Sequence, residues 1–205
     1  MNKNRIIKII LIFLFPTFLY ANDYCQKCGM DLHHHQKTSH IATNGDKEIE
    51  VCSLHCVIDV KKDGKKYRIK GFDNSTKSFI PINKLIYVVG SNQKGAMSSE
   101  SEFAFSKKDD ADRFQKENGG RLIDGREIIG YAESKWDKDK KMIENNQAKI
   151  KEMGQKIAKE YCNNADKIKA NNIADFKMEL KKYCQNIDGK GLQAAALYLW
   201  SQNDK

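Results

Sequence analysis

Two closely spaced cysteine pairs near the N-terminus constrain the fold of this chain more than any other feature. The first pair is the C-x-x-C of Cys25 and Cys28, and the second is the C-x-x-x-C of Cys52 and Cys56. Four thiols at these spacings can surround one metal ion if the chain brings the two pairs together. They can also form two disulfides, or one pair can serve as a redox centre, so the spacing leaves three alternatives open.

The first twenty residues have the pattern of an export signal. The basic stretch MNKNR is followed by the apolar run IIKIILIFLFPTFLY, which is shorter than the ~20 apolar residues of a membrane span. Ala21 offers a small residue at the expected cleavage site. We therefore expect residues 1–21 to be a signal peptide and the mature protein to begin near Asn22 in the periplasm. An uncleaved N-terminal membrane anchor is the alternative.

Composition and charge exclude several classes of function. The net charge of +9 includes three basic residues of the signal segment, and the other lysines are spread among acidic residues, so no nucleic-acid partner is expected. No Ser-His-Asp set, phosphate-binding loop or paired-acid motif suggests hydrolytic chemistry. All six cysteines lie in the exported part, where an oxidising environment favours disulfides.

The segment that follows the first cysteine pair predicts an α+β domain made of two ββαβ-like units. In the first unit, two short strands flank Asn44-Gly45, a dipeptide typical of a type I′ hairpin turn. A helix from about Leu54 to Lys62, with Ser53 as its N-cap, then leads to the strand KKYRIKGF. The second cysteine pair thus lies at a hairpin–helix junction, as in a treble-clef-like metal site.

A second pass of the same order follows along the chain. SEFAF predicts a strand, Ser106 is the expected N-cap of the helix KKDDADRFQKEN, and Gly119-Gly120 ends that helix before the strand RLI. Between the two units, residues 85–89 (LIYVV) predict a buried strand.

Beyond residue 131 the apolar residues adopt a helical period. They recur every seven positions at Trp136, Ile143, Ile150 and Ile157. This spacing predicts one apolar stripe along a charged helix, with Gly154 as its expected break. We expect a charged helical linker over residues 132–153 and a small all-helical domain over residues 154–205, with helices in ADFKMELKKYC and GLQAAALYLWSQ.

The tail weakly resembles a small cytochrome c that has lost its haem residues. Ala165 stands where the second cysteine of C-x-x-C-H would be, and Asp166 stands where the axial histidine would be. A helical domain of this size without a cofactor needs another staple, and a disulfide between Cys162 and Cys184 is the expected one. A generic helical appendage is the alternative.

From about Tyr24 to Ile129 the chain resembles the NosL family, the copper-binding accessory proteins of nitrous-oxide reductase. The resemblance rests on CGM, CSLHC, LIYVVG, GAM and FAFSKKDDADRFQKENGG; the CGM and CSLHC half also resembles the YHS and TRASH metal-binding modules. It implies a NosL-like domain over residues 22–131 and a periplasmic Cu(I) metallochaperone for nitrous-oxide reductase maturation in denitrification. The implied partner is the apo-reductase or another copper carrier. NosL proteins commonly carry a lipoprotein cysteine, which this chain lacks.

The resemblance also implies a Cu(I) site built from Cys28 and Met97, completed by Met30 or a histidine. Thiolate and thioether donors suit this soft ion better than carboxylates do. Among the five histidines, His40 is preferred because its predicted strand follows CGM and should pack near it. Three roles remain open for the other N-terminal cysteines, namely copper ligands, ligands of a structural zinc ion or disulfide partners. These cysteines are Cys25, Cys52 and Cys56.

Two other functions compete with copper delivery. A structural or adaptor protein stabilised by zinc would use all four N-terminal cysteines as ligands and dock a partner with its tail. A thiol oxidoreductase is less favoured, because the C-x-x-C lies at the mature N-terminus with no strand before it. Gly29 excludes haem attachment there. A dependence on Met97 distinguishes copper binding from both, since neither alternative uses a thioether.

Overall fold

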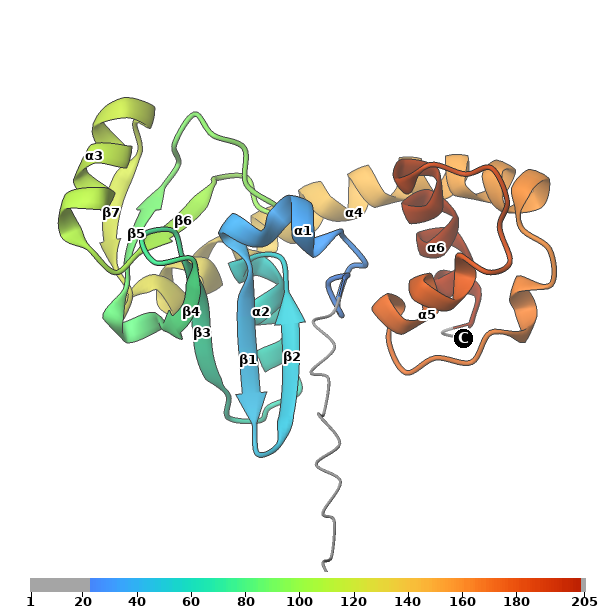
Figure 1. Cartoon of the computed structure of the whole chain (residues 1–205), viewed down its shortest axis with the longest axis horizontal. Helices are drawn as coiled ribbons and strands as arrows, with labels where there is room; N and C mark the ends of the chain where they lie inside the picture. Colours follow the sequence, from blue (N-terminus) through green and yellow to red (C-terminus); the bar gives the residue numbers. More distant parts are fainter. Residues whose placement is uncertain (1–22, 204–205) are drawn as a thin grey trace, which may run out of the picture.

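A seven-stranded mixed sheet forms the N-terminal part of the protein, and helices form the C-terminal part (Figure 1). The computed structural model describes residues 23–203, so the expected signal peptide over residues 1–21 lies outside the described residues. The strand order is β2-β1-β3-β6-β5-β7, with β4 also paired to β3. The predicted α+β class with a helical C-terminal region is confirmed.

The first ββαβ unit follows a short helix, α1 (Leu32–His35), and a 3-10 helix (Gln36–Thr38). It consists of β1 (His40–Asn44), β2 (Lys47–Val51), α2 (Leu54–Lys61) and β3 (Arg68–Asp73), and β4 (Ser78–Pro81) extends it. The hairpin turn differs from the prediction. Asn44 pairs with Lys47, so Gly45 and Asp46 are the central residues, and only Gly45 has a positive φ (57°). That pattern fits a type II′ turn, since type I′ needs two positive φ angles.

The second unit repeats the first with the same pairing pattern. It consists of β5 (Ile86–Val89), β6 (Glu102–Phe105), α3 (Lys108–Asn118) and β7 (Arg121–Asp124), and a 3-10 helix (Ile82–Lys84) precedes it. In each unit the first strand lies between the second and third strands and is antiparallel to both. The two predicted ββαβ units are therefore confirmed, but the strand expected between them is β5, the first strand of the second unit, and the short strand β4 was not predicted.

Asp73 joins the two units where β3 meets β6 in parallel. Its fully buried carboxylate accepts hydrogen bonds from the backbone N–H groups of Ser75, Thr76 and Ser106 and from the Thr76 and Ser106 hydroxyls. Ser106 was expected to cap α3, but its hydroxyl donates to Asp73 (2.6 Å) instead, and Lys107 occupies the N-cap position without a side-chain bond. The Ser106 side chain therefore links the two units through Asp73 instead of capping α3.

A single long helix, α4 (Ile128–Tyr161), leaves the sheet region and extends to the tail (Figure 1). It continues through Gly154, which was expected to break it. A Cβ atom at position 154 would lie 2.0 Å from the carbonyl oxygen of Ala194, so the glycine allows α6 (Gly189–Asn203) to approach closely. Within residues 23–203, no helix combines the length and the apolar character that crossing a bilayer requires.

The tail has its own hydrophobic core, separate from that of the sheet region. It contains the end of α4, a 3-10 helix (Ala165–Lys167), α5 (Ile173–Leu180) and α6. The core residues are Ala158, Ala165, Ile168, Phe176, Leu180, Cys184, Leu192, Ala195 and Ala196. A disulfide joins Cys162 to Cys184 at the edge of this core. The tail is thus a small helical unit with its own core and one internal disulfide.

Candidate metal centre

The four N-terminal cysteines meet in one cluster. The Sγ atoms of Cys25, Cys28, Cys52 and Cys56 all lie within 4.8 Å of one another. Cys28 is 3.5 Å from Cys52, and Cys52 is 3.9 Å from Cys56. All four side chains are buried in the main core, and all four are free thiols. These four cysteines therefore form no disulfide in the structure.

The C-x-x-C loop folds into a tight turn that directs both of its thiols inward. The backbone N–H of Gly29 donates to the carbonyl oxygen of Cys25 (2.8 Å), and that of Cys25 donates to the carbonyl oxygen of Met30 (2.8 Å). Gly29 has a φ of 72°, a conformation that glycine adopts without steric cost. The N–H of Gln26 donates to the backbone carbonyl oxygen of Glu50 on β2 (3.1 Å) and so holds the loop against the hairpin.

The second pair is positioned by the junction between β2 and α2. Cys52 directly follows β2, and its carbonyl oxygen accepts from the Thr38 hydroxyl (2.9 Å). Ser53 has extended backbone, and its side chain accepts from the N–H of Cys56 (3.4 Å), as the sequence predicted for an N-cap. Cys56 therefore lies in the first turn of α2, facing Cys52.

The thiols share their protons unequally. Burial raises the pKa of Cys25, but hydrogen bonds from the other three thiols and from the N–H of Lys27 offset it and hold that pKa well below its usual range. Hydrogen bonding to Cys25 in turn raises the pKa of both Cys52 and Cys56. The hydrogen bonds among the thiols therefore favour a thiolate within the buried cluster, and binding a metal through more sulfurs releases further protons.

The donor set fits a soft or borderline metal ion. A tetrahedral zinc–thiolate site with Zn–S bonds of about 2.3 Å places its sulfur atoms roughly 3.8 Å apart, close to the spacing seen here. The same thiolates suit Cu(I). In the described part of the chain this is the only cluster of three or more cysteine, histidine or acidic side chains close enough to share an ion.

His40 lies on β1 but is not part of this cluster. Its Nε2 atom is 3.0 Å from the hydroxyl of Tyr87, and its Nδ1 atom is buried without a partner. Burial lowers the pKa of His40 to about 4, so the imidazole is neutral at physiological pH. His33 and His34 on α1 are exposed, and His55 stacks on Trp136 of α4.

Met30 and Met97 are both partly buried and pack against the core that contains the cysteines. Met97 lies in the loop between β5 and β6 with a φ of 43°, an unusual value for a residue other than glycine. Neighbouring residues fix this loop: the Ser98 hydroxyl donates to the carbonyl oxygen of Glu100 (2.8 Å), and the N–H of Ser99 donates to Asp139 of α4 (3.1 Å). The fold thus holds Met97 in a strained backbone conformation against the main core, which also contains the four cysteines.

Two residues of the tail contact the cysteine loop and were not predicted. Lys177 of α5 donates to the carbonyl oxygen of Gly29 (2.9 Å), and Gln193 of α6 donates to that of Cys28 (2.9 Å). Lys177 is 2 % exposed, and burial lowers its pKa to about 8. A signal was present in the sequence, because Lys177 falls on the apolar face of its helix, four residues after Ile173.

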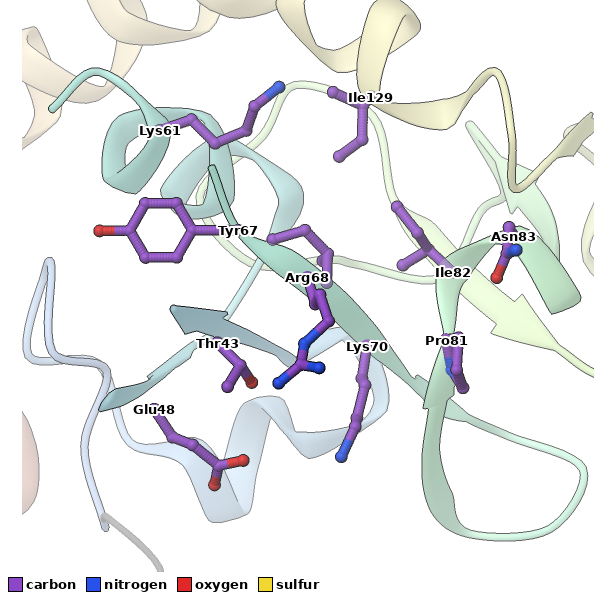
Figure 2. Close-up of a pocket in the computed structure, with 11 residues that line it drawn as sticks. Thr43, Glu48, Lys61, Tyr67, Arg68, Lys70, Pro81, Ile82, Asn83 and Ile129 are labelled. Atoms are coloured by element: carbon purple, nitrogen blue, oxygen red, sulfur yellow. The ribbon is translucent and has the colours of Figure 1, made fainter. Parts of the chain in front are cut away.

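A separate hollow on the sheet carries none of the predicted ligands. It has a volume of about 640 Å³ and is lined by residues of β1, β2, α2, β3 and β4 and by Ile129. Figure 2 shows Arg68 and Lys70 extending from β3 toward Glu48, with Lys61 on the opposite side. Its lining contains no sulfur or imidazole, so it offers none of the soft donors that the cysteine cluster has.

Fold and site together define an α+β protein with a buried four-thiol cluster suited to a metal ion. The NosL family model matches residues 16–131, more than half of the chain, and the chain belongs to the NosL family. Among solved structures, it is similar to the copper chaperone NosL from Shewanella denitrificans, with 26% identity and a TM-score of 0.40. That match covers 49% of this chain and 84% of the other. No curated protein gives a significant match.

Proposed function

We propose that this protein is a Cu(I)-binding metallochaperone that binds copper and passes it on without catalysing a reaction. The observation that carries the proposal is the gathering of four buried thiols in the part of the chain that belongs to the NosL family. Thiolates are the donors that Cu(I) prefers. Membership of a family of copper-binding accessory proteins supports copper as the cargo.

In this proposal Cys28 and Met97 bind the ion together, and Met30 assists. Cys28 is the most exposed of the four cysteines, at 5 %, so an incoming ligand reaches it first. The strained backbone of Met97 supports a role for its thioether, because such strain persists where surrounding contacts and function require it. Cys25, Cys52 and Cys56 supply further thiolates or hold the loop.

The recipient in this proposal is apo nitrous-oxide reductase or another copper carrier in the same compartment. A strain that lacks the gene should export the reductase but leave it short of copper when copper is limiting. Added copper should partly restore the metal content, because mass action can replace a carrier. The reductase from both strains is purified and its copper is measured. Fully metallated reductase in the deletion strain under limiting copper would rule out this role.

We also propose export to the periplasm, supported by the basic and apolar pattern of the first twenty residues. Mass spectrometry of periplasmic protein should give a chain that begins near Asn22 and carries no lipid. A retained Met1, or a diacylglycerol on Cys25, would contradict it.

The geometry of the cluster favours one second candidate, a zinc-stabilised structural or adaptor protein. Four thiols at nearly tetrahedral spacing match a closed zinc site, which uses no thioether. Replacing Met97 with leucine distinguishes the two candidates, since the change removes the sulfur and keeps the size. The matched control is Met142→Leu on the exposed side of α4.

A further inference from the structure

The side of the cysteine cluster that is nearest to solvent is covered by the tail. Gln193 and Lys177 donate to the consecutive carbonyl groups of Cys28 and Gly29, and they also bond to each other (2.5 Å). A Cβ atom on Gly29 would meet the side chain of Ile173 at 3.3 Å, so α5 packs directly on the loop. Lys177 also lies over the ring of Tyr24 (4.0 Å).

The closed arrangement prevents direct transfer of a metal ion. Transfer by ligand exchange requires that a donor on the partner reach a ligand sulfur, but all four thiols are at most 5 % exposed. Cys25 and Cys52 are 0 % exposed and Cys56 is 2 % exposed. Tail residues donate hydrogen bonds to the backbone carbonyl groups of Cys28 and of its neighbour Gly29. Moving the tail is therefore the shortest route to an open site.

The contact between the tail and the loop is less completely packed than either core. A cavity of about 650 Å³ lies at this junction and is lined by Met30, His34, Met153, Lys177 and Gln193, among others. The hydrogen bonds of Lys177 and Gln193 cross this junction, whereas α6 is fixed to α4 by the close approach of Gly154 and Ala194. Local opening is expected where apolar packing is sparse.

The long helix α4 connects the tail to the sheet region through a segment without buried residues. Ile143 is its last buried residue on the sheet side, and Gly154 is the first on the tail side. None of residues 144–153 is buried, and the segment includes Asn145 and Asn146, which have low helix propensity. Figure 1 shows this part of α4 spanning the two regions. Bending of this stretch would move the tail while its stapled core stays intact.

We propose that the C-terminal helical unit is a tethered cap that controls access to Cys28, with Lys177 and Gln193 as its latch. The role of this cap in metal transfer rests on the proposed chaperone function. Its role in shielding the Cys28 thiol does not depend on that function. An acceptor that presents a thiolate or thioether would dock on the surface of Cys28 and Gly29 that the cap occupies.

The first test measures how fast each cysteine of the reduced, metal-free full-length protein reacts with iodoacetamide, by peptide mass spectrometry. Lys177→Met removes the charge and the donor but keeps a long apolar stem, and Gln193→Leu removes the second donor. Lys177→Met should accelerate the alkylation of Cys28 by about tenfold or more, since its donor is charged, and Gln193→Leu should accelerate it by roughly two- to tenfold, the range of a neutral hydrogen bond. The matched control is Lys182→Met, whose parent side chain bonds only Glu179.

Two outcomes would overturn the proposal. Equal Cys28 rates in the parent and in both variants would show that the latch does not limit access. Equal acceleration of all four cysteines would show that the variants loosen the whole fold rather than lift a cap.

A second measurement links the cap to transfer. The Cu(I)-loaded parent and Lys177→Met are mixed with excess bathocuproine disulfonate, and formation of the coloured complex is followed in time. Faster release with an unchanged equilibrium affinity supports the cap, whereas an unchanged release rate contradicts its role in transfer. If the parent does not bind Cu(I), the proposed function fails, and the alkylation rates still decide whether the cap exists.

Discussion

Replacing Asp73 with asparagine should destabilise the metal-free protein by about 2 kcal/mol at pH 7. The hydrogen bonds that its carboxylate accepts lower the pKa of Asp73 to about 2 against the burial that would raise it, from an ordinary value of 3.8. At about 1.4 kcal/mol per pH unit, this difference corresponds to roughly 2 kcal/mol of stability for the charged form. With a urea m-value of about 2 kcal/mol/M, the unfolding midpoint should fall by about 1 M.

The pH dependence gives the prediction a second signature. Because the pKa of Asp73 is lower in the folded protein, its contribution is fully present above pH ~4 and is lost as the pH falls through about 2. The variant should lack this loss. Asp124→Asn is the matched control: the pKa of Asp124 is also about 2, through Arg126, but the pair is exposed to solvent, so its loss should not change the midpoint measurably. The reasoning is refuted if both variants unfold at the same urea concentration as the parent.

Two further predictions concern the tail. Gly154→Ala should destabilise it by roughly 1–3 kcal/mol, because the clash with Ala194 outweighs the gain in helix propensity. Gly130→Ala in the same helix meets nothing within 4 Å and should be neutral or stabilising, and calorimetry of both variants checks the contrast. Replacing Cys162 and Cys184 with serine should lower the stability of the tail by on the order of 3 kcal/mol, followed by tryptophan fluorescence in urea. An unchanged tail midpoint in reducing and non-reducing buffer would contradict that estimate.

The local elements could be predicted from the sequence because their signals are local. The Ser53 cap, the strand LIYVV and the glycine stop after α3 each depend on a few adjacent residues, and each lies where it was expected. The order of elements was sufficient to predict two ββαβ units. Ser106 was misassigned because its partner, Asp73, lies 33 positions earlier in the chain. The turn at Gly45 was shifted by one residue, since strand register fixes which residues are central.

The composition of the candidate site was more predictable than its surroundings. Cysteine spacing predicted that four thiols could meet around one ion, and they do. The cover over Cys28 could not be predicted, because Lys177 and Gln193 lie 148 and 165 residues from the carbonyl groups they contact and reach the loop only through the path of α4. Gly154 resembles a helix break in the sequence, and only the approach of α6 shows why glycine is needed there.

Copper affinity tests the central claim most directly. The reduced full-length protein is titrated anaerobically with Cu(I) against a competing chelator, in parallel with Zn²⁺, for the parent, Cys28→Ser and Met97→Leu. We predict tight Cu(I) binding by the parent, loss of that binding in Cys28→Ser and weaker binding in Met97→Leu, with the zinc affinity of Met97→Leu unchanged. Cu(I) binding by Met97→Leu as tight as that of the parent would contradict the account and favour the zinc-stabilised adaptor.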